Sequence, residues 1–78
     1  MVLFPNPVLD LLTVSPEIFT ELNPTGEIQI FSMDGTLMSQ KTISLNDHQI
    51  DMSALPMGYY AVTIQIGTIT EQHLIYKN

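Results

Sequence analysis

Hydrophobic and polar residues alternate along most of the chain in short runs. The alternation is clearest where Ile28 and Ile30 flank Gln29, and it is longest from Tyr59 to Ile66. A run of this kind predicts a β-strand with one buried face, because successive side chains of a strand point to opposite sides. The runs predict strands over residues 9–14, 17–22, 27–32, 36–43, 49–52, 59–66 and 68–77.

Turn-forming residues separate these runs at intervals of roughly 8–12 residues, a spacing typical of an all-β sandwich or barrel. The clearest turns are Asn23-Pro24-Thr25-Gly26, Asp34-Gly35, Pro56-Met57-Gly58 and Gly67-Thr68. No long window carries the period of a helix, and no connection is long enough for a parallel crossover. We therefore expect an all-β fold: a small Ig-like antiparallel β-sandwich of about seven strands, with no substantial helix.

The alternation also assigns faces to the first strand. Leu12 and Val14 share the side expected to face the core, which leaves Leu9 and Leu11 pointing outward. Neighbouring apolar side chains on an outer face indicate a partner or a covering segment, but isolated exposed leucines also occur without any such role. The sequence leaves both interpretations open.

The register of the last strand depends on the loop at Gly67-Thr68. A two-residue loop turns Glu71 and His73 toward the core, whereas a three-residue loop turns Leu74 and Tyr76 inward. A slip of one residue inverts every side chain of a strand. We expect the three-residue loop, with Leu74 protected and His73 exposed, because it keeps charge out of the core.

Composition narrows the possible functions. The 78 residues are 45% hydrophobic and 13% charged, which predicts one folded domain over residues 1–78 rather than a disordered segment. Eight acidic residues oppose two lysines and no arginine, for a net charge of −6. This balance disfavours binding to nucleic acid or to anionic lipid. The absence of cysteine excludes disulfides and thiolate metal sites.

Residues able to do chemistry are few and scattered. His48 and His73 lie far apart in the sequence and follow no catalytic spacing, so we expect no catalytic residue. Asp34 precedes a glycine and is expected to shape a turn rather than bind a metal. Asp47 and Asp51 form one pair that could approach near a loop end and hold a cation, but we expect no metal or cofactor.

Short motifs occur along the chain in a distinctive order. Phe4-Pro5-Asn6-Pro7 precedes the first strand, and Met33-Asp34-Gly35 follows the third. Leu55-Pro56-Met57-Gly58-Tyr59-Tyr60 opens the strongest strand, and the last strand ends Leu74-Ile75-Tyr76-Lys77-Asn78. Each motif alone is weak. In this order they resemble the C-terminal sorting domain of the type IX (Por) secretion system, in its type A form, over essentially the whole chain.

The resemblance assigns motif and recognition positions in this sequence. They are Pro5, Asn6, Pro7, Asp34, Gly35, Leu55, Pro56, Gly58, Tyr60, His73, Leu74, Ile75, Tyr76 and Lys77. We expect Gly35 and Gly58 to act mainly by permitting turns, and Pro56 and Tyr60 by fixing a turn and filling the core. We expect the terminal strand from Gln72 to Asn78 to contact the machinery directly, because a strand edge is a natural docking template. The chain departs from the family at His73, where a lysine is usual, and at Leu9 and Leu11, where polar residues are usual.

The resemblance implies a non-enzymatic C-terminal secretion signal. Such a domain directs an attached N-terminal passenger protein through the outer-membrane translocon, with a shuttle protein and a sortase as further partners. It crosses the periplasm and is removed at the cell surface, so that the passenger stays on the surface or is secreted. The cleavage site lies upstream of the opening motif, and Met1-Val2 is then read as an expression start. No cofactor, nucleic acid or membrane insertion is implied.

The sequence is also compatible with other functions. The alternative function is a carbohydrate- or protein-binding β-sandwich module at the end of a surface enzyme, and a third is a purely structural end domain. The net charge favours a monomer, while a strand-swapped dimer is the alternative for a thin sandwich with open edges.

Overall fold

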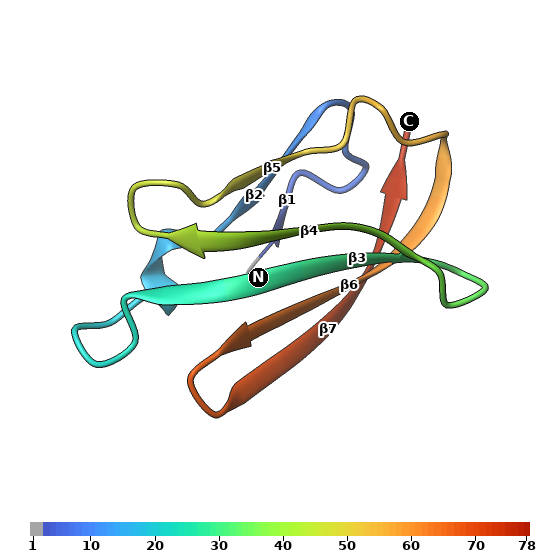
Figure 1. The fold of residues 1–78 in the computed structure, drawn as a ribbon. Coiled ribbons are helices and arrows are strands. Elements are labelled where there is room, and N and C mark those ends of the chain that lie inside the picture. Colours follow the sequence, from blue (N-terminus) through green and yellow to red (C-terminus); the bar gives the residue numbers. More distant parts are fainter. Residues whose placement is uncertain (1–2) are drawn as a thin grey trace.

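The computed structural model describes residues 3–78 and folds them into seven strands and one short 3₁₀ helix (Figure 1). The elements are β1 (Leu3–Phe4), β2 (Leu11–Val14), η1 (Pro16–Ile18), β3 (Thr25–Ser32), β4 (Leu37–Ser44), β5 (Gln49–Asp51), β6 (Gly58–Ile66) and β7 (Ile69–Lys77). They form two sheets, ordered β1-β2-β5 and β4-β3-β6-β7, in which neighbouring strands run antiparallel. The predicted all-β fold of two antiparallel sheets is confirmed for the described residues.

The predicted set of strands is wrong near the start of the chain. The strand expected over residues 17–22 is instead η1 followed by a turn. Pro16 favours this helix because its fixed φ suits a first helical position, and its carbonyl accepts a hydrogen bond from the Phe19 N–H at 3.2 Å. The seventh strand is β1, which pairs with Thr13 and Val14 of β2. A strand of two residues is too short to show an alternating pattern.

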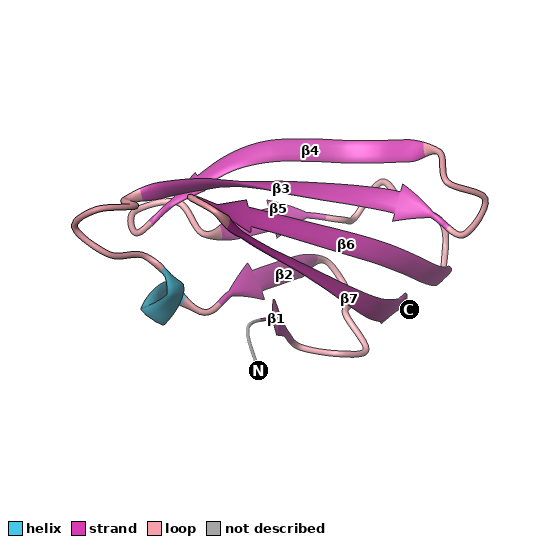
Figure 2. Cartoon of the chain, turned by 90° about the horizontal axis from the view of Figure 1, so that it is seen from below, coloured by secondary structure: helices cyan, strands magenta, loops and turns pink. Residues whose placement is uncertain are grey.

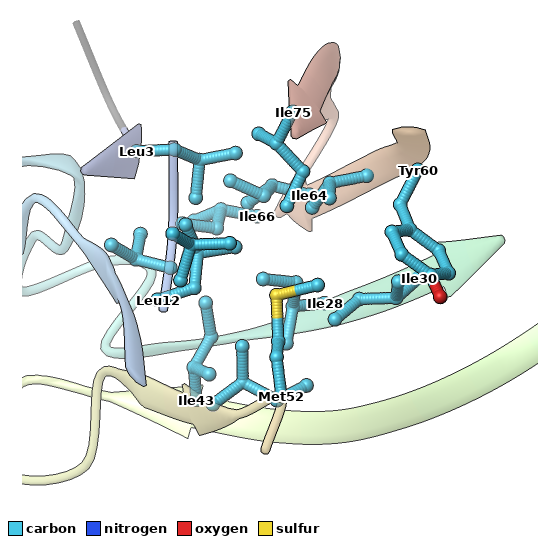
Figure 3. Close-up of a cluster of buried hydrophobic side chains, with 14 residues drawn as sticks. Leu3, Leu12, Ile28, Ile30, Ile43, Met52, Tyr60, Ile64, Ile66 and Ile75 are labelled. Atoms are coloured by element: carbon cyan, nitrogen blue, oxygen red, sulfur yellow. The ribbon is translucent and has the colours of Figure 1, made fainter. Parts of the chain in front are cut away.

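The core lies between the two sheets, as Figure 3 shows. Its buried side chains are Leu3, Val8, Leu12, Val14, Ile28, Ile30, Ile43, Ile50, Met52, Tyr60, Val62, Ile64, Ile66 and Ile75. Burying a side chain of this size contributes roughly 1.5–3 kcal/mol to stability. The predicted faces are confirmed: Leu12 and Val14 are fully buried, whereas Leu9 and Leu11 are 63% and 47% exposed.

The last strand has the register that we did not expect. A two-residue turn at Gly67-Thr68 leaves Leu74 56% exposed on the outer face, while His73 lies half-buried on the core-facing side. The prediction assumed that the core covers the whole length of this strand. The β1-β2-β5 sheet is built from strands of two to four residues, against eight or nine in its partner. The first half of β7 therefore extends past the core, and Glu71 remains exposed on the core-facing side.

The loops gather at two ends of the sandwich (Figures 1 and 2). The motif end consists of the loops over residues 5–10, 33–36 and 52–57, together with residues 77–78. The opposite end consists of residues 15–24, 45–48 and 67–68. In Figure 2 the motif end is on the right, beside the C label, and η1 marks the opposite end on the left.

Candidate functional site

The motif segments that are separated in the sequence all lie at the motif end (Figure 2). Strand pairing brings them there: Gly58 at the start of β6 pairs with Lys77 near the end of β7, and Ser32 at the end of β3 pairs with Tyr60. Val8 then forms a parallel bridge with Lys77. The opening, central and terminal motifs thus form a single region of the surface.

Asn6 joins the opening motif to the terminal strand. Its side-chain Oδ1 accepts a hydrogen bond from the Tyr76 N–H at 3.0 Å, and its Nδ2 donates to the Leu74 carbonyl at 3.4 Å. The Val8 N–H donates to the Tyr76 carbonyl at 2.8 Å, and the peptide bond between Asn6 and Pro7 is cis. A carboxamide carries a donor and an acceptor side by side. The Asn6 side chain therefore pairs with β7 as the backbone of a neighbouring strand would.

The Leu-Pro-x-Gly-x-Tyr motif stabilises its own turn. The Tyr60 ring is buried, and its hydroxyl donates to the Pro56 carbonyl at 2.6 Å. Leu55 packs against the core from the same loop. Gly58 has a φ of +144°, which side chains with a Cβ rarely adopt, although no atom would meet a Cβ there within 4 Å. Glycine is needed at this position because of the backbone conformation rather than for space.

The Asp34-Gly35 turn connects β3 to β4, as the sequence predicts. Gly35 has a φ of +89°. The Asp34 carboxylate accepts hydrogen bonds from the Ser32 hydroxyl and from the Thr36 N–H, the latter at 3.2 Å. The Ser32 bond, followed by those of Thr36, lowers the pKa of Asp34 below its ordinary value of 3.8. The carboxylate is therefore ionised at neutral pH and holds the turn.

The outward edge of β7 is only partly open. In an antiparallel ladder every second residue directs its backbone groups away from the paired strand. On β7 these residues include Leu74 and Tyr76, which bond to the opening motif, and the Asn78 N–H donates to the Val8 carbonyl at 2.8 Å. The expectation of an open edge from Gln72 to Asn78 is thus wrong for the part beyond Gln72. Within residues 3–78, the outward backbone groups of Thr70 and Gln72 and the N–H of Leu74 are left for a partner strand.

The terminal side chains divide between the two faces of the sheet. Ile75 and Lys77 are buried on the core-facing side, and the Lys77 Nζ donates to the main-chain oxygen of Asn78 at 2.8 Å. His73 occupies the position where the family usually has a lysine, and its Nε2 lies 3.0 Å from the Glu71 Oε1. The Lys77 ammonium is therefore occupied within the domain. Leu74 and Tyr76 lie on the outer face.

The described residues bring few chemically reactive side chains together. They contain no group of three or more His, Cys, Asp or Glu side chains that could hold a metal ion. Asp47 pairs with Lys41 at 2.7 Å, and Asp51 accepts the Ser53 N–H at 2.8 Å. A small apolar hollow of about 140 Å³ at the opposite end is lined by Ile18, Ile64, Ile66, Ile69 and Glu71. That volume is below the roughly 300–1,000 Å³ of small-molecule sites, whereas two wider surface hollows of about 350 and 380 Å³, beside Gln65 and beside Phe19, reach the lower end of that range.

Comparison with known families identifies the kind of domain. A family model described as the secretion system C-terminal sorting domain matches residues 2–77. The chain belongs to the type IX secretion C-terminal sorting domain family. No curated protein matches the chain. Among the described residues, the structure has no helix long and apolar enough to cross a membrane.

Membership of this family establishes the broad role of the chain. A sorting domain of this family acts with the type IX machinery and implies an attached N-terminal passenger that goes to the cell surface or outside the cell. The family is not an enzyme family.

Two further groups of residues at the motif end were not identified from the sequence motifs. Val8 is fully buried and bridges the opening motif to β7, although the predicted first strand began only after it. The second group lies on the outer face of the β4-β3-β6-β7 sheet, where Phe31 is directly opposite both Leu37 and Ala61. The alternation signals this position, because Phe31 falls on the side opposite Ile28 and Ile30.

Proposed function

We propose that residues 1–78 act as a single non-enzymatic sorting domain that directs its passenger from the periplasm through the type IX translocon. A shuttle protein and the translocon bind the folded domain, and a surface sortase then removes it. The domain acts as a monomer.

The convergence of the motifs at one end of the sandwich carries this proposal. Asn6 on the opening segment and Tyr76 on the terminal strand form a hydrogen bond only when the whole chain has folded. At the same end, Tyr60 and Gly58 hold the loop over residues 52–57. These contacts support a signal that the machinery reads as an assembled surface, since the individual motif residues are largely occupied by contacts within the domain.

A transport assay tests the proposal. The chain with its native upstream linker is fused behind a fluorescent protein that carries a periplasmic export signal, in a host with type IX machinery. We expect reporter at the surface or in the medium, without the sorting domain, and retention of the reporter in a translocon-deficient strain. A fusion lacking the domain is the control.

If the domain is folded but the reporter stays in the periplasm of both the host with type IX machinery and the translocon-deficient strain, the sorting role is contradicted. That outcome would favour the alternative binding module, for which saturable binding on a glycan array is the decisive measurement. If the reporter were released with the domain still attached, the sorting role would stand, but removal of the domain by a sortase would be contradicted.

A further inference from the structure

The outer face of the β4-β3-β6-β7 sheet divides into a polar half and an apolar half. Cross-strand pairing places residues of the four strands in rows. Toward the opposite end the rows are Thr42-Glu27-Gln65-Thr70 and Gln40-Gln29-Thr63-Gln72. Toward the motif end they are Leu37-Phe31-Ala61-Leu74 and Tyr59-Tyr76. We call the six residues of the last two rows the apolar platform.

A solvated sheet face normally carries polar side chains, as the half toward the opposite end does. The apolar platform departs from this rule on the same strands. Leu37, Tyr59 and Leu74 are 44%, 57% and 56% exposed, so water reaches a contiguous apolar surface that spans the sheet. Contiguous exposed apolar surface of this kind marks an interaction site.

The aromatic part of the platform is ordered before any partner binds. The rings of Tyr59 and Tyr76 pack edge to face, with their centroids 5.0 Å apart and an angle of 65° between their planes. Such a pair contributes roughly 0.5–1.5 kcal/mol beyond its buried area. Rings that are already held in place lose little conformational entropy on binding.

The edge contacts of β7 favour docking on this face. A partner strand added beside Leu74 or Tyr76 would have to displace the Asn6 side chain, which already bonds to their backbone groups. The side chains of the same two residues remain available on the outer face.

Charge restricts the kind of partner. The chain has a net charge of −6 and two basic side chains besides histidine. Lys41 pairs with Asp47, and Lys77 is buried, so neither offers a free cation to an acidic partner. Asp34 lies in the turn just beyond the platform and is ionised at neutral pH. Two copies of this chain repel one another, and anionic lipid is repelled as well.

We propose that the apolar platform is the surface through which the domain binds a protein of the type IX machinery, at an apolar patch bordered by Lys or Arg. This inference rests on the proposed sorting function and specifies the face that carries it.

Substitution on the platform with a matched control tests the inference. Leu74→Gln in the reporter fusion removes an exposed apolar side chain of the platform, and Gln65→Ala changes an exposed side chain in the polar half of the same outer face, on β6. We expect Leu74→Gln to reduce export about tenfold, the effect of losing one important contact in an interface. We expect Gln65→Ala to export like the parent. Thermal unfolding of both variants should stay within a few degrees of the parent, which separates binding from folding.

Site-specific photo-crosslinking identifies the partner. A photoreactive phenylalanine at position 74 is expected to give a translocon-dependent adduct with a protein of the machinery, whereas the same group at position 65 is not. The adduct yield should fall as salt rises, because salt screens attraction between acidic and basic surfaces.

The possible outcomes separate the two proposals. Normal export of Leu74→Gln, or crosslinking from position 74 to a second copy of the chain alone, would overturn the platform and leave the sorting function intact. Failure of the parent domain to be exported would overturn the sorting function, and the platform with it.

Discussion

The two ends of the β4-β3-β6-β7 sheet use the same strands in different ways. At the motif end Asn6 bonds to the edge of β7, Tyr60 closes the loop before β6, and the outer face is apolar. At the opposite end the outer face is polar, and Glu71 and Ile69 are exposed although they are on the core-facing side. Figure 2 shows the three-stranded sheet covering only part of its longer partner.

This difference indicates where the sequence is most constrained. The family motifs are concentrated where the first and last segments of the chain meet, and long-range contacts can form there only after the intervening strands have paired. The opposite end needs little beyond short turns. A signal that must report complete folding is best located where both ends of the domain are required.

The largest expected effect comes from truncating a side chain on the core-facing side of β7. The size of the effect should differ between the two ends of the sandwich. Ile75 is 2% exposed, and Ile75→Ala should lower the free energy of unfolding by about 2–5 kcal/mol because it leaves a cavity. Glu71→Ala, four positions earlier and exposed, should cost less than about 1 kcal/mol. Urea unfolding measures both values. Equal losses would mean that β7 is equally constrained along its length and that the two ends of the sandwich do not differ in stability.

A smaller effect is expected from removing the bond between the opening and terminal segments. Asn6→Ala loses two side-chain hydrogen bonds to β7 and should cost about 1–2 kcal/mol, with faster hydrogen exchange of the Tyr76 amide. Asn46→Ala is the control at the opposite end, because the Asn46 side chain is exposed and makes no hydrogen bond within the described residues. It should change stability by less than about 0.5 kcal/mol. Unchanged exchange at Tyr76 in Asn6→Ala would show that Asn6 does not hold the edge.

The smallest effect concerns how the stability contributed by the Asp34-Gly35 turn depends on pH. The pKa of Asp34 is lowered in the folded state, so its contribution to stability is present above about pH 4 and is lost as pH falls through the folded pKa. Asp34→Asn should therefore unfold at a lower temperature than the parent at pH 7, and the difference should shrink below pH 4. Thermal unfolding monitored by circular dichroism from pH 7 to pH 2.5 follows it. A difference that stays constant over this range would assign the effect to something other than the carboxylate charge.

Most of the architecture could be predicted from local patterns. The alternation around Ile30 and along β6 placed the right side chains in the core, because a strand directs successive residues to opposite faces wherever it lies. The turn at Asp34-Gly35 was also predictable from its residue types. The sorting family was predictable as well, since its motifs appear in order along the chain.

The predictions failed where one segment depends on a distant one. The strand expected over residues 17–22 and the missed pairing of β1 both depend on which segment joins β2 at the sheet edge. The register of β7 depends on how far the opposing sheet extends, which the sequence of β7 does not contain. The apolar platform became visible only once pairing had placed Phe31, Ala61 and Leu74 in one row.

The sequence by itself determined the all-β class, the buried faces of the central strands and the turns at Gly35 and Gly58. Each of these follows from side-chain period or backbone conformation within a few residues. The tertiary structure alone decided that Asn6 closes the edge beside Leu74 and Tyr76, and that those side chains face outward. Contacts of this kind depend on strand order and sheet length, which arise only when both sheets pack together.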